Sequence, residues 1–300
     1  MENTIWSEGI QGILNLDLSR EVRFRDDRKE LYLNLLGLKE GMTIVDIGCG
    51  PGTLTRKIAK WLEEAEIIGI DRDTKFIDFA KSKAVEQNLR NIVYYEGDAL
   101  NLPLEDNSVD ACISHTIIEH VPNKEFLLEQ KRICKPKGRV CVMYSRPDKY
   151  IKTEPDLLPK QSQREKELLN RLFMDTDKVN KKYNVGKYWP DSIVLPKLFE
   201  EVGFKNIQID AVAVPIAIDD SRNRDEEKIV IVEGEKQQLF EGIDVGLKLN
   251  GSNRLSSKEI DELKELVSNR FNERINLIKD GISIWDYTII ITQIVSGIVE

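Results

Sequence analysis

The sequence contains little of what would build a metal centre, a disulfide framework or a nucleic-acid surface. Among its 300 residues are four cysteines and two histidines, and no two cysteines form a Cys-x-x-Cys pair. We therefore expect neither a metal site nor a disulfide framework. The formal net charge is −8. Such a balance lacks the excess of Lys and Arg that binds phosphate backbones, so we expect no nucleic-acid partner.

Long apolar runs and targeting segments are also missing. The first residues have neither the basic start nor the apolar stretch of a signal peptide. The apolar run within residues 284–298 falls short of the ~20 residues that span a bilayer as a helix. With 41% hydrophobic residues, the chain has enough apolar side chains for a core. We expect a cytoplasmic protein without a membrane span, either a monomer or a homodimer.

Strand-like and helix-like segments alternate over residues 42–145. The predicted strands are 42–47, 66–71, 91–98, 109–114 and 139–145, and the predicted helices are 53–64, 74–87 and 122–134. Strands separated by helices of this length predict βαβ units with right-handed crossovers, and therefore a parallel sheet.

The regular alternation stops after residue 145. Residues 146–190 are rich in proline and charge, and residues 217–283 form a second polar interval. Within and around these intervals, helices are predicted over 162–173, 191–202 and 256–279, and strands over 206–216 and 284–298. Two further helices, 5–15 and 26–36, are predicted before the first strand, separated by a highly charged stretch.

A glycine-rich run, Asp46-Ile47-Gly48-Cys49-Gly50-Pro51-Gly52, follows the first predicted strand. Glycines at such a turn let the backbone approach a ligand closely and start a helix beside it. A dinucleotide-binding loop would place its third glycine at position 53, where threonine stands, whereas here glycine falls at 52. The spacing disfavours an NAD-dependent oxidoreductase, which stays an alternative.

Acidic residues also close the second and third strands. Asp71 ends the second strand, where a carboxylate can accept hydrogen bonds from both hydroxyls of a ribose. An alternative for Asp71 is the N-cap of the next helix. After the third strand, Asp98 can accept from an adenine amino group and the Ala99 amide can donate to a ring nitrogen. The stem of Arg72 is expected to lie against the adenine.

These motifs together resemble those of class I S-adenosylmethionine-dependent methyltransferases, in particular the ubiquinone-biosynthesis-like branch that methylates small molecules. The resemblance covers residues 42–145 and rests on the glycine-rich run, Asp71, Gly97-Asp98-Ala99 with the following NLPLEDNSVD, and the turn at 132–138. It implies S-adenosylmethionine as cofactor and S-adenosylhomocysteine as product. The cofactor-binding residues it implies are Asp46, Gly48, Cys49, Gly50, Gly52, Asp71, Arg72, Gly97, Asp98, Ala99 and Ser114.

The resemblance also implies a fold and a division of the chain. We expect an α/β, Rossmann-like, doubly wound sheet of seven mostly parallel strands with an antiparallel last strand. Residues 1–36 would form an N-terminal helical cap, and residues 37–300 a methyltransferase domain. The intervals 146–190 and 217–283 would be helical insertions that form a lid over the sheet.

Both histidines of the chain, His115 and His120, follow the fourth predicted strand. Open parallel sheets bind ligands at the carboxyl ends of their strands, so this segment is expected to face the transferred methyl group and the acceptor. Imidazole titrates near neutral pH, which makes both residues candidates for a catalytic base. The alternative is a family motif without a role in proton transfer.

The reaction implied is in-line displacement at a sulfonium methyl group, in which the protein mainly holds donor and acceptor in line. No Asn-Pro-Pro-aromatic tetrapeptide follows the fourth strand, and no Pro-Cys pair occurs, so a small-molecule acceptor is favoured over nucleic acid. A protein acceptor and a catalytically silent cofactor-binding module stay alternatives. Aromatic residues that could cover the cofactor or acceptor are Trp6, Phe24, Tyr183, Tyr188 and Trp189. The identity of the acceptor stays open.

Overall fold

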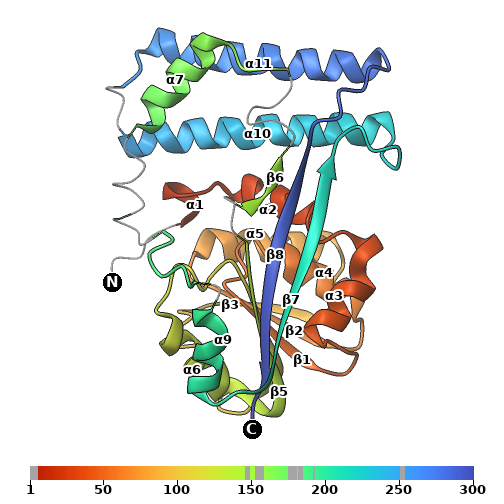
Figure 1. Ribbon diagram of the computed structural model, residues 1–300, viewed down its shortest axis with the longest axis vertical. Coiled ribbons are helices and arrows are strands. Elements are labelled where there is room, and N and C mark those ends of the chain that lie inside the picture. Colours follow the sequence, from red (N-terminus) through yellow and green to blue (C-terminus); the bar gives the residue numbers. More distant parts are fainter. Residues whose placement is uncertain are drawn as a thin grey trace.

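The computed structural model of the protein describes residues 6–145, 149–152, 159–174, 181, 185–191, 193–250 and 254–300. Their centre is a twisted sheet (Figure 1) in the order β3-β2-β1-β4-β5-β8-β6, with β7 also paired to β8. Its strands are β1 (Thr43–Ile47), β2 (Glu66–Asp71), β3 (Ile92–Glu96), β4 (Val109–His115), β5 (Cys134–Ser145), β6 (Ile151–Lys152), β7 (Lys205–Ala217) and β8 (Tyr287–Ile298).

The strand directions confirm the predicted α/β fold. Strands β1 to β5 pair in parallel, and β8 runs antiparallel to β5, β6 and β7. The seven predicted strands are all present, and the two-residue β6 adds an eighth at the edge beside β8. Strand β5 begins five residues before the predicted 139, because the turn at Lys137, which has a φ of +67°, lies within a continuous extended segment.

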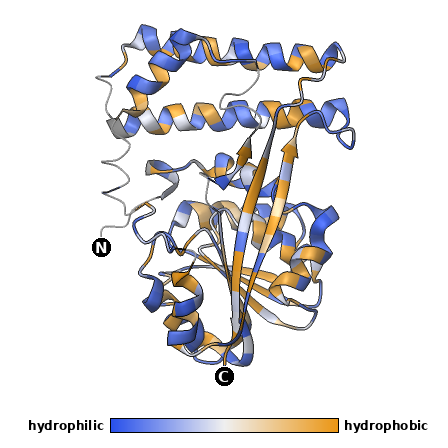
Figure 2. Ribbon diagram, in the orientation of Figure 1, coloured by the Kyte–Doolittle hydropathy of each residue, from blue (hydrophilic) through white to orange (hydrophobic). Residues whose placement is uncertain are grey.

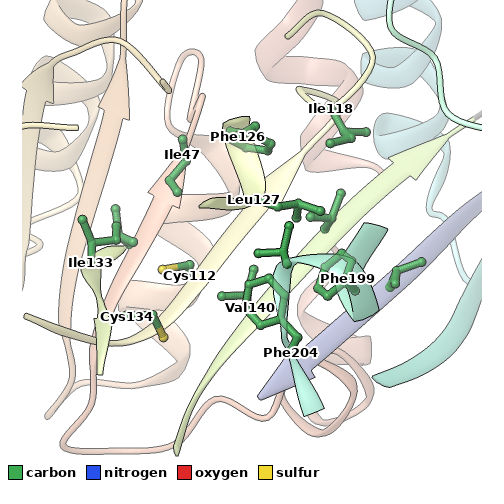
Figure 3. Close-up of a cluster of buried hydrophobic side chains, with 14 of the residues drawn as sticks. Ile47, Cys112, Ile118, Phe126, Leu127, Ile133, Cys134, Val140, Phe199 and Phe204 are labelled. Atoms are coloured by element: carbon green, nitrogen blue, oxygen red, sulfur yellow. The ribbon is translucent and has the colours of Figure 1, made fainter. Parts of the chain in front are cut away.

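Helices cover both faces of the sheet. On one face lie α6 (Asn123–Ile133) and α9 (Val194–Val202), whose apolar side chains pack on Val45, Ile47 and Cys112 (Figure 3). On the other face, α3 (Lys29–Leu36) and α4 (Thr53–Trp61) pack on Ile44 and Ile113. Helix α5 (Thr74–Glu86) packs on β3. Neighbouring strand residues thus point to opposite faces, as the period of two in a strand requires.

A separate helical layer lies at one end of the sheet. It consists of α7 (Gln163–Phe173), α10 (Asp225–Asn250) and α11 (Ser257–Lys279), and it has an apolar core of its own. Strands β7 and β8 run from the sheet toward this layer (Figure 1). Figure 2 shows apolar residues concentrated in the sheet and alternating with polar ones along α10 and α11.

Helix α10 is the largest element that the sequence did not predict. Three glycines, Gly234, Gly242 and Gly246, lie inside it, and each lowers helix propensity. Gly246 has a packing reason, because a Cβ there would lie 2.9 Å from the Phe173 ring of α7. The glycine lets the two helices approach closely, which offsets its conformational cost.

The N-terminal segment lies between the helical layer and the sheet. The predicted helix 5–15 is wrong as one element: α1 (Trp6–Gly9) and α2 (Ile13–Glu21) are separated at Gly12, whose backbone is extended. A short helix, η1 (Asp26–Arg28), follows. The Asn15 amide donates to Glu241 of α10 at 2.9 Å, while Asp17 accepts from Arg56 of α4 at 2.6 Å. No helix in the described parts of the chain is long and apolar enough to cross a membrane.

Candidate functional site

A cavity of about 420 Å³ opens at the carboxyl ends of β1, β2 and β4, a size in the ~300–1,000 Å³ range of small-molecule pockets. The glycine-rich run lines it, as do residues of the N-terminal segment and Tyr150, Val185 and Trp189 of the interval 146–190. Of the predicted site residues, those that line it are Asp46, Gly48, Cys49, Gly50, Asp71, Arg72, Gly97, Asp98, Ala99, His115 and His120. Gly52 and Ser114 are not among the lining residues.

The glycine-rich run is held against the end of β2. The amides of Gly48 and Cys49 both donate to the Ile70 carbonyl, at 2.7 and 3.0 Å. Gly48 has a φ of +69°, and a Cβ there would lie 2.1 Å from Ile117. The run therefore needs glycine for its backbone conformation and for close approach to the segment after β4.

Gly52 serves packing around the run. Its φ is +78°, and it precedes the first residue of α4. A Cβ at this position would lie 2.5 Å from the Tyr94 hydroxyl of β3 and 2.8 Å from Ala80 of α5. Ser114 is fully buried in β4, and its hydroxyl has no hydrogen-bond partner among the described residues.

Two acidic residues face the cavity from adjacent strands. Asp46 is 2% exposed and accepts a hydrogen bond from the Thr55 hydroxyl at 2.7 Å. Burial raises the pKa of Asp46 to about 7, against the opposing effect of that hydrogen bond. Asp71 accepts from the amides of Gly50 at 2.8 Å and Asp73 at 2.9 Å, and burial raises its pKa to about 6.

The N-cap of α5 is Asp73 rather than Asp71. The Asp73 side chain accepts from the amides of Lys75 and Phe76 at the start of α5. Its second oxygen accepts from the Ser7 amide at 2.7 Å, which fastens α1 beside the cavity. Asp71 is therefore left to hold the glycine-rich run and to face the cavity.

The two histidines have different surroundings. His115 is 7% exposed, contacts the Phe24 ring edge-on at 5.1 Å, and has an unpartnered Nε2 within the described structure. Burial, together with Arg20 and Arg23, keeps its pKa well below the usual value. His120 accepts the Gly186 amide at Nδ1, at 3.0 Å, and its ring lies 4.7 Å from that of Trp6.

Among the proposed aromatic residues, Trp6 and Trp189 line the cavity. Phe24 lies in the apolar core behind His115, and Tyr188 is not a lining residue. Tyr183 lies outside the described residues. Within the described chain, no group of three His, Cys, Asp or Glu residues could hold a metal ion.

Three charged residues that the sequence did not single out also line the cavity: Arg20, Arg23 and Glu119. Glu119 is 3% exposed, its Oε2 has no partner among the described residues, and burial raises its pKa to about 7. Arg20 donates to the Thr116 hydroxyl at 2.9 Å. The charge of residues 19–27 is visible in the sequence, and Glu119 precedes His120 in a pattern of the resembled family, but neither pattern places these side chains in a cavity.

Thr116, the residue next to His115, has an uncommon backbone conformation. Its φ is +57°, a left-handed value that costs energy for a β-branched residue. The Thr116 hydroxyl accepts from Arg20 and donates to the His115 carbonyl at 2.7 Å. Strain of this kind tends to occur where a backbone is shaped for ligand binding.

Comparison with known proteins gives matches in sequence. The model of a family described as "methyltransferase domain" matches residues 38–201. An uncharacterized methyltransferase of Schizosaccharomyces pombe is 32% identical over 111 residues, covering 35% of this chain and 40% of that protein. A demethylmenaquinone methyltransferase of Staphylococcus aureus is 28% identical over 186 residues, covering 58% of this chain and 72% of that protein. The chain thus spans less than half of the first of these relatives.

Solved structures give matches in fold. A Haemonchus contortus phosphoethanolamine N-methyltransferase 2, in complex with S-adenosylmethionine, superimposes with a TM-score of 0.53 at 17% identity, covering 99% of this chain and 60% of that one. A geranyl diphosphate C-methyltransferase from Streptomyces coelicolor gives 0.50 at 13% identity, covering 95% and 83%. At these identities the likeness concerns the fold alone.

Proposed function

The chain belongs to the methyltransferase-domain family, and from that membership and the geometry of its cavity we propose that it transfers a methyl group from S-adenosylmethionine to a small-molecule acceptor. The observation that carries this proposal is that one cavity joins the glycine-rich run, Asp71 and the segment after β4. A donor site and an acceptor site therefore share one enclosed space.

The residues around the cavity fit such a cofactor. The glycine-rich run, in which a Cβ at Gly48 would meet Ile117, leaves room for a methionine moiety, and Asp46 faces it as a partner for an ammonium group. Asp71 also lines the cavity and would accept hydrogen bonds from the hydroxyls of a ribose, and Asp98 and Ala99, likewise lining residues, would bind an adenine. Arg72 and Gly97 would complete that end. Gly52 and Ser114 would contribute indirectly, by packing against the residues that line the cavity.

The bound cofactor would supply the reactive sulfonium methyl group, so this chain has to orient the acceptor and exclude water. A base is needed only for an acceptor that loses a proton. His120 is a poor base, because its Nδ1 already accepts a hydrogen bond and its ring proton therefore sits on Nε2. A protonated His115 would be destabilised by burial and by Arg20. Glu119, with a pKa of about 7, is better suited.

We further propose how the cavity is covered. Trp6, Ile10 and Arg20 of the N-terminal segment line it, as do Val185 and Trp189 of the interval 146–190. These parts would act as the lid. No described residue of 217–283 is a lining residue, and α10 instead supports α2 through Glu241. The interval 217–283 would therefore hold the lid in place from behind. A location in the cytoplasm and a monomeric or homodimeric state stay predictions.

Cofactor binding is tested by calorimetric titration with S-adenosylhomocysteine and, separately, with NAD. We expect saturable binding of the first and none of the second; the reverse would contradict the proposal. Asp71→Asn should weaken binding ~10- to 100-fold, because a charged acceptor contributes about 1.5–3 kcal/mol. The control is Asp78→Asn, an exposed residue of α5, which should leave the affinity unchanged.

Catalysis is tested separately, by transfer of a labelled methyl group from S-adenosylmethionine into fractionated cell extract. Label in the small-molecule fraction supports the proposed acceptor class. Label in protein would favour a protein methyltransferase instead. Cofactor binding without label in any fraction would favour a catalytically silent module.

A further inference from the structure

Two arginines lie side by side in the cover of the cavity. Arg20 is in the last turn of α2, and Arg23 follows three residues later, so both side chains project from the same side of the chain. Both line the cavity. The Arg23 amide bonds to the Arg20 carbonyl at 3.1 Å, which fixes the spacing of the two residues.

Neither guanidinium has a carboxylate partner within ion-pair distance among the described residues. Arg20 donates to two hydroxyls, those of Ser19 at 3.0 Å and Thr116 at 2.9 Å. The Nε of Arg23 is buried and has no partner in the described chain. Burial and, after it, the neighbouring Arg23 charge lower the pKa of Arg20 to about 9. The Tyr150 hydroxyl is hydrogen-bonded to Arg23 and places a further polar group beside the two arginines.

Two partly buried guanidinium groups without a carboxylate at ion-pair distance are costly, because each has lost part of its water and each repels the other. Two buried cations of the neighbouring α4 are paired, by contrast: Arg56 contacts Asp17, and Lys57 contacts Glu21 and Asp26. The guanidinium fork fits carboxylates and phosphates in particular. The arrangement is that of a site prepared for an oxyanion.

The cofactor alone would not balance this charge. S-adenosylmethionine carries one carboxylate against an ammonium and a sulfonium, so it brings net positive charge into the cavity. The charges of Asp46 and Glu119 act on Arg20, whereas the groups that act on Arg23 are the hydroxyls of Tyr150 and Tyr32. Arg23 is therefore the member of the pair with fewer acidic groups nearby.

We propose, building on the function above, that Arg20 and Arg23 bind an oxyanion of the methyl acceptor, so that the acceptor is an anionic small molecule. A carboxylate and a phosphate share the required chemistry. The same cavity is also lined by Ile10, Val121 and Val185, which would accommodate an apolar body. The acceptor thus combines one anionic group with an apolar or aromatic part.

The test uses benzoate, phenyl phosphate and the neutral isostere benzamide, each titrated calorimetrically into the protein with and without saturating S-adenosylhomocysteine. We expect one or both anions to bind ~10- to 100-fold more tightly than benzamide, as charge-assisted hydrogen bonds would give. The stronger of the two anions identifies carboxylate or phosphate. Equal binding of benzamide and both anions would overturn the proposal.

Variants locate the effect. Arg23→Met should remove the preference for the anion while the affinity for S-adenosylhomocysteine stays the same, and Arg23→Lys should retain part of the preference. The matched control is Arg25→Met, a residue paired with Asp27 outside the cavity, which should retain all of it. Circular dichroism checks that each variant is folded, and if Arg23→Met is not, the lysine variant carries the test.

Two other outcomes overturn the proposal. If Arg23→Met weakens S-adenosylhomocysteine as much as the anion, the pair binds the carboxylate of the cofactor. If the wild type binds S-adenosylhomocysteine but shows no preference for anions, the acceptor is not anionic, although the proposed function still holds. Failure of the wild type to bind S-adenosylhomocysteine at all would contradict the proposed function itself, and the titrations without it still decide whether the arginines bind anions.

Discussion

Buried charges are arranged differently in the helical layer and in the cavity. In the helical layer, Arg270 of α11 contacts both oxygens of Glu165 of α7, with distances of 2.9 to 3.1 Å. Arg274 contacts Asp219 at 2.9 Å and Asp286 at 3.0 Å. In the cavity, by contrast, neither Arg20 nor Arg23 has a carboxylate within ion-pair distance among the described residues, and one Glu119 oxygen has no partner there.

The paired charges of the helical layer stabilise the fold, whereas the unpaired charges line the cavity of the proposed binding site. A paired buried charge offsets its own desolvation, whereas an unpaired one remains costly until something binds it. Burial raises the pKa values of Asp46, Asp71 and Glu119 in the cavity, whereas the hydrogen bonds of Asp219 outweigh its burial and hold its pKa below the usual value. The division is not complete, because burial also raises the pKa values of Glu235 in α10 and of Asp286. The unpaired charges in the cavity therefore lower the stability of the protein until a ligand binds them.

The contrast is tested most strongly by Arg270→Met, which leaves Glu165 buried without its partner. We expect the free energy of unfolding to fall by about 3–5 kcal/mol, because removal of one member of a buried pair strands the other. Urea denaturation followed by circular dichroism measures it. Arg164→Met, on the same layer, removes an exposed partner of Glu262 and should cost under ~1 kcal/mol. Similar losses in the two variants would contradict the assigned role.

Within the cavity, Gly48→Ala should affect binding more than folding. The left-handed backbone costs about 1–2 kcal/mol for a residue with a Cβ. Gly41→Ala is the matched control, since Gly41 has a φ of +76° and open space around it. Gly48→Ala adds a clash with Ile117, so only this variant should lose affinity for S-adenosylhomocysteine, by ~tenfold or more. Recovery in the double variant with Ile117→Ala would show that the clash is the cause, and its absence would contradict it.

The smallest effect concerns pH. With a pKa near 7, Asp46 is neutral in mildly acidic solution and charged in mildly basic solution, where it attracts an ammonium group. The affinity for S-adenosylhomocysteine should therefore rise with pH through this range, by at most ~tenfold per pH unit below the pKa. Asp71, raised to about 6, acts in the same direction at lower pH. Titrations of Asp46→Asn should show a flatter profile, and those of Asp78→Asn the profile of the wild type.

Stability should change with pH in the opposite sense. An acid whose pKa is raised by folding binds more protons in the folded state, so its contribution to stability is greatest in acid and is lost as pH rises through the folded pKa. For Asp46 the window runs from a pKa of 3.8, that of an unperturbed aspartate, to about 7. Asp46→Asn should therefore gain stability relative to wild type as the pH increases over that interval. A constant difference would show that Asp46 is not buried as described.

Most of the sheet could be predicted because its signals are local. The strand around Val45 ends in glycines, and the helix from Ser257 starts with a capping box at Ser256 and Glu259, which the structure contains. The glycine spacing at Gly52, compared with Thr53, indicated a methyltransferase, and the family match confirms it.

The remainder depends on contacts between distant segments. No residue near Gly246 in the sequence indicates that Phe173 will pack on it. Without that contact, the glycines of α10 predict breaks in a helix. Arg20 and Glu119 likewise line one cavity although they lie far apart in the sequence, and the contacts that hold α2 there are those of Asn15 with Glu241 and of Asp17 with Arg56. Sequence patterns show the periodicity of one segment, whereas the surroundings of these side chains are formed by two or three segments that are distant in the sequence.

The position of β8 in the sheet has a consequence for biosynthesis. It lies between β5 and its neighbours β6 and β7, yet it is made after all of them. While the ribosome is still extending the chain, β5 and β7 carry unpaired backbone edges, which invite pairing with other chains. The parallel half of the sheet can assemble early, but the molecule is protected from aggregation only once Tyr287–Ile298 has emerged and inserted.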